Sequence, residues 1–317
     1  MIKNVNVTVV GGINIDVKAK SYDELVAKSS NPGSIKVTAG GVGRNIAHNL
    51  ALLGVPVTFL SVIGTNDEGL GILEQTAAAG VNIDHVLRLS GLRTGTYIAL
   101  LDSSGEMELA VSDMEILEYL TVEYLQSKSE VLKSSAYIVC DTNIPAASVK
   151  YLVELAASSG IPICVEPVSV AKAMKVKDML CGISLVTPNR DELEALAGMS
   201  IAQVDLEQVA QGLVAKGVAN VLVTLGKDGI CLINSAGAHY YKSYETQVLD
   251  VTGAGDSLTA GLIYGLLKYG DMDAACRTGL AAAAVTVASK ETVSKAMNES
   301  NVLKIVASGI YKEADIK

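Results

Sequence analysis

The sequence lacks the cysteine and histidine patterns of a metal-binding or disulfide-rich protein. Among its 317 residues, the five cysteines are scattered singly without a C-x-x-C pair, and the three histidines lie far apart. A structural zinc site needs such residues at close spacing, and a disulfide framework needs paired cysteines. We therefore expect a reduced, cytoplasmic protein without structural zinc.

Basic runs and long apolar runs are also absent. The net charge of −9 disfavours general binding to nucleic acid or to an anionic membrane, although a local pocket can still bind an anion. The first ten residues lead into a strand pattern and have no apolar core or cleavage site of a signal peptide. The most apolar helix candidate, residues 279–288, is too short to span a bilayer. We expect neither a nucleic-acid partner nor a membrane partner.

Half of the residues are hydrophobic, and the length suits one large α/β domain with a small appendage. Short β-branched runs alternate with helical patterns, which is typical of a mainly parallel sheet covered on both faces. Strands are predicted at residues 5–10, 57–63, 136–140, 163–166, 185–187, 221–224 and 229–233. Helices are predicted at residues 44–53 and 70–79, each followed by a glycine that suits a helix C-terminus.

Two segments do not follow this alternation. They are residues 13–38 and 94–114, and the second has the pattern of a hairpin in which residues 96–101 and 107–111 flank a turn. We expect both segments to form a small β-sheet, a lid that covers a site or meets another subunit. The main α/β domain then comprises residues 1–12, 39–93 and 115–317.

The most informative motif is Asp250-Val-Thr-Gly-Ala-Gly-Asp256, which opens an apolar helix pattern. Gly253, Ala254 and Gly255 leave backbone N–H groups open to a phosphate where a helix begins and its dipole favours negative charge. Asp256 is predicted in the first helical turn, where a carboxylate can take a proton from a hydroxyl during phosphoryl transfer. The alternative is that Asp256 only caps the helix.

Polar residues near the first expected strand and the first expected helix suit sugar hydroxyls. Asn14 and Asp16 offer a donor-acceptor amide and a pure acceptor, or else form an ordinary polar turn. The Gly40-Gly41 loop leads to Asn45, which either binds hydroxyls or belongs to a glycine turn with a helix cap. Arg44 is either a phosphate or base contact or a salt-bridge partner at the helix start. The loop is a poor dinucleotide fingerprint, because its spacing is not G-x-G-x-x-G and it does not follow the first strand.

Two further motifs follow expected strands, where ligands bind in open α/β sheets. Asn189 and Glu192 are three residues apart at a helix start, and such a pair can hold Mg²⁺ through its water shell or can form a capping arrangement. Thr224 and Gly226 lie where a strand meets a glycine turn, and they either contact phosphate or form a simple β-turn.

The order and spacing of these motifs resemble the ribokinase-like, or PfkB, carbohydrate kinase family over nearly the whole chain. The resemblance rests on Gly11-Gly12-x-Asn14-x-Asp16, on Gly40-Gly41 with Asn45, on Asn189-x-x-Glu192, on Thr224-x-Gly226 and on Asp250-x-x-Gly-Ala-Gly-Asp256. It implies a three-layer α/β/α fold with a mainly parallel central sheet and a small β-sheet lid. It also implies an ATP-dependent phosphotransferase and, through the lid, a homodimer.

Roles for individual residues follow from the resemblance. Asp256 is the expected base, and the phosphoryl anion hole comprises Gly253, Ala254 and Gly255. ATP phosphates are assigned to Thr224 and Gly226, water-bound Mg²⁺ to Asn189 and Glu192, and a monovalent cation such as K⁺ to Asp250 and Thr252. Ribosyl hydroxyls are assigned to Asp16, Gly41 and Asn45, and a nucleobase to Asn14, Thr96, Ser112, Asp113 and Asn143. The adenine pocket is expected around residues 281–289. Glu166 departs from the family, which commonly has aspartate there.

Within the family, the likeness is strongest to kinases of pseudouridine. It rests on Ser30-Asn-Pro-Gly33, on the 40–45 loop, and on Val111-Ser-Asp-Met114 followed by Glu115-Ile116. The implied substrate is therefore pseudouridine, a small-molecule nucleoside phosphorylated at its 5′-hydroxyl. The alternatives are another sugar or nucleoside kinase of the family, such as a ribokinase or a uridine, cytidine or inosine kinase, and a catalytically silent ligand-sensing module.

Overall fold

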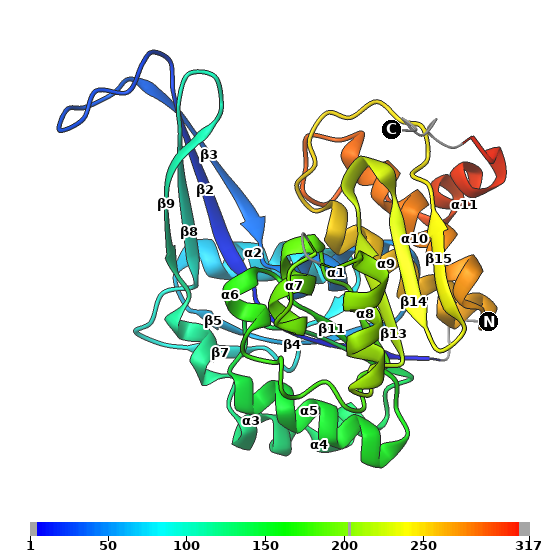
Figure 1. Ribbon diagram of the computed structural model, residues 1–317. Coiled ribbons are helices and arrows are strands. Elements are labelled where there is room, and N and C mark those ends of the chain that lie inside the picture. Colours follow the sequence, from blue (N-terminus) through cyan, green and yellow to red (C-terminus); the bar gives the residue numbers. More distant parts are fainter. Residues whose placement is uncertain (1–4, 202–203, 311–317) are drawn as a thin grey trace.

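The computed structural model describes residues 5–201 and 204–310 (Figure 1), so residues 1–4 and 311–317 of the expected main domain lie outside it. Within these ranges nine strands form one sheet in the order β15-β14-β13-β12-β11-β10-β1-β4-β6. All neighbours pair in parallel except β13 with β14 and β14 with β15. The bounds are β1 (Val7–Val10), β4 (Val57–Leu60), β6 (Val81–Asn82), β10 (Tyr137–Asp141), β11 (Ile163–Glu166), β12 (Leu185–Val186), β13 (Asn220–Thr224), β14 (Ile230–Asn234) and β15 (Gly237–Tyr241).

Helices cover both faces of this sheet because its strands are apolar on both sides. Val7 and Val9 pack into one core, whereas Val10 packs into the other. The first core is closed by α1 (Val42–Leu52), α2 (Asp67–Ala78), α9 (Ala254–Tyr269), α10 (Met272–Val287) and α11 (Glu299–Ser308). The second is closed by α3 (Val122–Ser127), α4 (Ser129–Lys133), α5 (Ala146–Ser159), α6 (Val170–Ala173), α7 (Arg190–Ala197) and α8 (Leu206–Ala215). The predicted three-layer α/β/α fold is confirmed.

The predicted strand at 57–63 is wrong in one respect. The chain leaves the main sheet at Ser61, whose hydroxyl donates to the carbonyl of Gly11 at 2.6 Å. The segment after it, β5 (Val62–Gly64), pairs instead with β7 (Leu87–Leu89) in a separate two-stranded sheet. A continuous apolar run does not reveal such a change of partner, because both halves are buried.

The two segments outside the βα alternation form a four-stranded sheet, which we call the arm. Its order is β3-β2-β8-β9, with β2 (Asn14–Ser21) parallel to β8 (Thr96–Leu101) and antiparallel to β3 (Gly33–Gly40). The predicted hairpin is confirmed, since β8 pairs antiparallel with β9 (Met107–Asp113). Figure 1 shows the arm projecting from the body of the molecule, with its turns at the far end.

The register divides the arm into two faces. Val17 lies beside Val37 and Ile98, and Ile98 lies beside Val111, so one face is apolar. We call it the outer face. The inner face includes Asp16 and Lys18 and turns toward the body, where the Nζ of Lys36 donates to the carbonyl of Lys290 at 3.3 Å.

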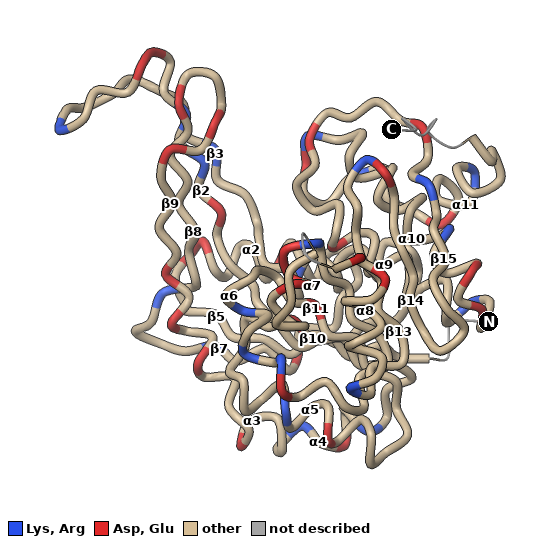
Figure 2. Tube along the Cα trace, viewed as in Figure 1, with Lys and Arg blue, Asp and Glu red and all other residues tan. Residues whose placement is uncertain are grey.

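Charged residues are interspersed along the trace, as Figure 2 shows. The described part of the chain contains no helix that is both long and apolar enough to cross a membrane. Two short 3₁₀ helices, η2 (Glu115–Tyr119) and η3 (Gly226–Asp228), follow β9 and β13.

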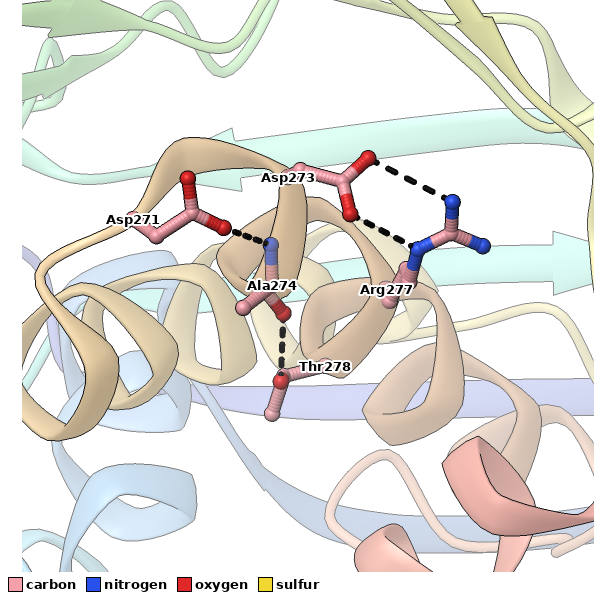
Figure 3. A network of polar contacts seen from close by, with 5 residues as sticks. All are labelled: Asp271, Asp273, Ala274, Arg277 and Thr278. Atoms are coloured by element: carbon pink, nitrogen blue, oxygen red, sulfur yellow. Dashed lines mark hydrogen bonds and ion pairs between the residues drawn. The ribbon is translucent and has the colours of Figure 1, made fainter.

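Local polar contacts fix the start of α10 (Figure 3). The Asp271 carboxylate accepts the N–H of Ala274 at 2.8 Å and caps the helix. One turn on, the Asp273 carboxylate accepts the Nε of Arg277 at 2.9 Å. These contacts hold α10 where its small residues pack against α9.

The α9–α10 pair predicts a sharp contrast between two glycines. A Cβ on Gly265 of α9 would lie 2.6 Å from the Cα of Ala275, whereas a Cβ on Gly212 of α8 meets nothing within 4 Å. We expect Gly265→Ala to lower the free energy of unfolding by about 1–3 kcal/mol through overpacking. Gly212→Ala should raise it by about 0.5–1 kcal/mol, because alanine favours a helix interior. Urea unfolding of both variants checks this, and equal effects would contradict the close approach of the two helices.

Candidate active site

A buried carboxylate, Asp141 at the end of β10, organises the polar end of the sheet. It is fully buried, and its Oδ2 accepts the backbone N–H of Gly12 at 2.9 Å and of Gly43 at 2.7 Å. Its Oδ1 accepts the N–H of Asn143. Burial raises the pKa of Asp141, while these N–H donors oppose the rise. One side chain thus joins the turn after β1, the start of α1 and the loop after β10.

Glycine is required where these segments meet. A Cβ on Gly11 would lie 2.4 Å from the Asp141 Oδ2, and one on Gly41 would lie 2.3 Å from the carbonyl oxygen of Gly12. Gly41 also has a φ of 100°, which favours glycine. The Gly11-Gly12 and Gly40-Gly41 motifs therefore allow close backbone packing, a role that adds to any contact of Gly41 with a ligand.

Asp256 lies in the first turn of α9, as predicted, but it does not cap the helix. The N-cap residue is Gly253, with a φ of 81°, and no side-chain capping bond is made there. The Asp256 Oδ2 instead accepts the Nδ2 of Asn45 at 2.8 Å. The capping alternative is thus wrong, and α1 and α9 meet at this hydrogen bond.

The surroundings of Asp256 give it the acidity of a general base at neutral pH. Burial, together with the Asp141 and Asp16 carboxylates, raises its pKa to about 7. The hydrogen bond from Asn45 and the charge of Arg44 act in the opposite direction. A base works best when its pKa lies near the working pH, because it is then unprotonated yet still basic.

Asn14 and Asp16 lie on the inner face of the arm next to this base. They belong to β2 rather than to a turn, so the turn alternative is wrong. The Asn14 Nδ2 donates to the Asp16 Oδ1 at 2.6 Å, and burial raises the pKa of Asp16 despite this bond. Gly40 leaves room for the Asp16 carboxylate, since its Cβ would lie 2.3 Å from Oδ2.

An apolar cavity of about 360 Å³ opens on the other side of the start of α9. Its polar end is lined by Thr224, Gly226, Ala254 and Gly255. Its apolar wall includes Val248, Val251, Leu258, Leu280, Ala283, Ala284 and Val287. Three of these wall residues fall in the segment 281–289 expected to form the adenine pocket. Of the rest, Leu258 lies on α9, Leu280 on α10, and Val248 and Val251 in the loop before α9.

Asn189 and Glu192 form a capping box at the start of α7. The Asn189 Oδ1 accepts the N–H of Glu192 at 2.9 Å, and the Glu192 Oε2 accepts the N–H of Asn189 at 2.9 Å. Asn189 also forms a β-bridge with Thr224, which places the pair beside the polar end of the cavity. One Glu192 carboxylate oxygen takes no part in the capping box. The predicted capping arrangement is therefore confirmed, and it still leaves an oxygen for a water-bound cation.

Glu166, the residue that departs from the family pattern, accepts hydrogen bonds from two hydroxyl groups. The Thr187 hydroxyl donates to its Oε2, and the Thr259 hydroxyl lies 3.3 Å from the same atom. Burial, together with the Glu192 and Asp256 charges, raises the pKa of Glu166 to about 8. The raised pKa favours the protonated form of Glu166 at neutral pH.

Asp250 and Thr252 lie together in the loop before α9. The N–H of Thr252 donates to the Asp250 Oδ1 at 2.9 Å. Although burial opposes the change, this bond and the charges of Lys18 and Lys36 lower the pKa of Asp250. Across residues 5–201 and 204–310, no cluster of three or more His, Cys, Asp or Glu side chains could hold a metal ion on its own.

The residues predicted to contact a nucleobase are only partly brought together. The Lys172 Nζ donates to the Oδ1 of Asn143, whose amide lies next to Gly12. Ser112 lies beside Tyr97, which pairs with Asp16, so it shares the inner face of the arm. Thr96 and Asp113 pair with each other and share the face of Ile15, opposite to Asp16.

Several site residues have no signal in the sequence. Asp141 ends a strand but belongs to no motif, and Lys172 lies in a four-residue helix. Thr76 and Gln75 of α2, which bind Arg44, are ordinary helical residues. Only the rule that strand ends face the ligand could have drawn attention to Asp141.

The fold and this site define a phosphotransferase with an alcohol acceptor. The carboxylate of Asp256 lies in the first turn of a glycine-rich helix start that lines an apolar cavity, and Asn45 and Asp16 lie near it. The pattern of the pfkB family carbohydrate kinases matches residues 4–299. The chain therefore belongs to the pfkB family of carbohydrate kinases.

Three known proteins illustrate the relationship. The pseudouridine kinase of Escherichia coli K12 is 40% identical over 81% of this chain and 82% of its own length. An uncharacterized sugar kinase of the same organism, YeiI, is 35% identical over 94% of this chain and 82% of its own length. The ribokinase of Arabidopsis thaliana, solved in complex with ribose and ATP, shares the fold with a TM-score of 0.81 and 24% identity, covering 95% of this chain and 98% of that one.

The position of Asp256 predicts a specific pH dependence. As a base it must be unprotonated, so kcat/KM should fall about tenfold per pH unit below its pKa of about 7. Asp256→Asn should lower kcat by about a hundredfold or more and leave the KM for ATP nearly unchanged. Initial rates between about pH 5.5 and 9 check this. Asp273→Asn removes a surface carboxylate as the control, and near-normal turnover by Asp256→Asn would rule out the base.

Proposed function

We propose that this enzyme transfers the γ-phosphoryl group of ATP to the 5′-hydroxyl of pseudouridine, giving pseudouridine 5′-phosphate. The observation that carries the chemistry is Asp256, a buried carboxylate in the first turn of α9, which follows Ala254 and Gly255 of the apolar cavity and lies close to the Asp16 carboxylate. The substrate rests on the identity to the E. coli pseudouridine kinase. The cysteine pattern supports the cytoplasm as the place where this happens.

On the acceptor side, Asp16, Gly41 and Asn45 bind the ribosyl hydroxyls. Asp16 is a pure acceptor and suits a pair of hydroxyl donors. We assign the base of the nucleoside to Asn14 and Ser112 on the inner face of the arm and to Asn143 in the loop after β10. Thr96 and Asp113 lie on the opposite face of the arm and are not assigned to the base of the nucleoside.

On the donor side, the apolar cavity accepts the adenine and the start of α9 accepts the phosphates. Its volume of about 360 Å³ lies in the range of small-ligand pockets. Gly253, Ala254 and Gly255 offer N–H groups at the positive end of the helix dipole, as a developing phosphoryl charge requires. Thr224 and Gly226 line the same end of the cavity and hold the nucleotide phosphates.

Magnesium fits this site as a water-bound ion. Asn189 and Glu192 lie beside Thr224, and the free oxygen of the Glu192 carboxylate suits the water shell that Mg²⁺ retains. The ion would neutralise charge on the phosphates. We assign a monovalent cation such as K⁺ to Asp250 and Thr252. One oxygen of the Asp250 carboxylate already accepts the N–H of Thr252, so only the other oxygen is left for the cation.

A different sugar or nucleoside as acceptor is the second candidate function, because YeiI is also similar and its substrate is not stated. Ribose, uridine, cytidine and inosine are the acceptors to compare. A silent ligand-sensing module is disfavoured, since Asp256 and the three residues before it are all present.

Substrate profiling tests the proposed function. We expect ADP release with Mg-ATP and K⁺ to give a kcat/KM for pseudouridine at least about tenfold above that for uridine, cytidine, inosine or ribose. The reason is that polar groups placed for one base are left unpaired by another. A preference for a different acceptor would keep the chemistry but replace the substrate, and no turnover with any acceptor would favour the silent module.

We also propose that the arm is a lid over the acceptor pocket and that its outer face pairs two subunits. The outer face leaves Ile35, Leu109 and Val111 exposed by 73%, 68% and 67%. Such a continuous apolar sheet face is rare on a monomer. The bond from Lys36 to Lys290 supports the lid, because it joins the inner face to the far side of the site.

The dimer has a matched pair of variants. Leu109→Glu places a charge on the outer face, whereas Ala110→Glu places one on the opposite face of the same strand. We expect wild type and Ala110→Glu to sediment as dimers, and Leu109→Glu to dissociate at least about tenfold more readily. A monomeric wild type at all concentrations would contradict the proposal.

A further inference from the structure

Arg44 is a buried cation in the middle of the active site. Only 3% of the surface of Arg44 is exposed to solvent. Its Nε donates to the Thr76 hydroxyl at 3.2 Å, its Nη1 to the Asn45 Oδ1 at 3.1 Å and its Nη2 to the Gln75 Oε1 at 3.3 Å. The hydrogen bonds therefore spread the planar group across two elements, α1 and α2. An arginine held in this way has little surface left for a substrate.

Asn45 connects this arginine to the proposed base. Its Oδ1 accepts from Arg44, and its Nδ2 donates to the Asp256 Oδ2 at 2.8 Å. An amide can bind in two orientations that exchange its oxygen and nitrogen. Because a guanidinium only donates, Arg44 forces the oxygen toward itself and the NH₂ group toward Asp256. The second hydrogen of Nδ2 remains available for a substrate hydroxyl.

We propose that Arg44 is a positioning residue: by fixing the amide of Asn45, it fixes the Asp256 carboxylate that removes the proton from the acceptor hydroxyl. This inference rests on the proposed function, in which Asp256 is the base. Arg44 is then neither a substrate contact nor a partner in a surface salt bridge, the two roles between which the sequence leaves a choice.

The anchors of Arg44 explain why arginine is needed here. The Thr76 hydroxyl is fully buried and donates in turn to the carbonyl of Ile72 at 2.8 Å, so its lone pair is directed at the Nε of Arg44. A lysine at this position keeps the charge but has a single nitrogen and cannot bridge Thr76, Gln75 and Asn45 together. Charge and orientation can thus be separated by substitution.

The charge of Arg44 also acts on the base directly. The groups facing Asp256 are the Asp16 carboxylate from β2, Asp141 from β10, Glu166 from β11 and Arg44 from α1. His48, one turn along α1, faces Arg44 and has its pKa lowered to about 4, so it is neutral at pH 7. Arg44 is therefore the cation among these groups, and its loss should raise the pKa of Asp256.

Kinetics of three variants test the proposal, with the acceptor that the wild type phosphorylates best. We expect Arg44→Met to lower kcat by about 10- to 100-fold with less than about a threefold change in the KM for ATP. The acid limb of kcat/KM should move up by about one pH unit. Arg44→Lys should restore the acid limb but only part of kcat. Thr76→Val should lower kcat by a smaller factor than Arg44→Met and should leave the pH of the acid limb of kcat/KM unchanged.

The control is Arg277→Met, which removes a surface arginine paired with Asp273 on α10 (Figure 3) and should change neither kcat nor the limb. An Arg44→Met enzyme with kcat within about twofold of wild type would overturn the proposal. An equal loss at every pH, with Arg44→Lys no better than Arg44→Met, would assign Arg44 a purely structural role.

A titration without substrate keeps this test separate from the proposed function. The carboxyl carbon of Asp256, assigned with Asp256→Asn, is followed by NMR against pH in wild type, Arg44→Lys and Arg44→Met. We expect a higher pKa only in Arg44→Met, and an unchanged pKa would contradict the proposal even if no acceptor is turned over. If Arg44→Met does not fold, Arg44→Lys and Thr76→Val carry the kinetic test, and a wild-type kcat in both would overturn the proposal.

Discussion

The hydrogen bonds of one buried carboxylate hold the acceptor half of the site together. The Asp141 Oδ2 binds the N–H groups of Gly12 and Gly43, and the N–H of Arg44 donates to the carbonyl of Gly12 at 3.0 Å. These bonds press the turn after β1 against the start of α1 so closely that a side chain at position 11, 41 or 43 would collide with its neighbours. Burying a carboxylate costs free energy unless it is fully hydrogen-bonded, and here three backbone donors meet that requirement. The position of α1, and with it Arg44 and Asn45, follows from this contact.

The two halves of the site differ in electrostatic character. Asp16, Asp141 and Asp256 lie close together on the proposed acceptor side, and these acidic surroundings suit a neutral polyhydroxyl molecule better than an anion. The donor side has an apolar cavity and a helix start, which suit a flat base followed by phosphates. Asp256 lies between the two, and burial, together with the neighbouring carboxylates, raises its pKa toward neutrality. The net charge of −9 is therefore compatible with an anionic co-substrate, because the local field at the helix start matters more than the total.

The arm shows how a sheet built from distant segments serves a site and a surface at once. β2 and β3 follow β1 in the sequence but do not belong to the main sheet. β8 and β9 pair with them, although β8 begins some 80 residues after the start of β2. Alternation along β2 directs Asp16 to the acceptor pocket and Val17 to the outer face. A shift of one residue in register would exchange these faces. The strand pair does contain one such shift, a bulge between Leu100 and Leu101, but this bulge lies toward the far end of the arm and leaves the register next to the site unchanged.

The sequence by itself determined the α/β class, most strands, and the start of α9 with Asp256 in its first turn, because periodicity and glycine placement act over a few residues. It also determined the hairpin of the arm, and it offered the cap formed by Asn189 and Glu192 as one of two alternatives. Only the tertiary structure decided that the run at 57–63 changes sheets, that Asp141 braces two glycine loops, and that Arg44 turns inward to Thr76 and Asn45. It likewise placed Thr96 and Asp113 on the face opposite to Asp16. These features depend on which distant segments meet and on strand register, and local sequence patterns contain neither.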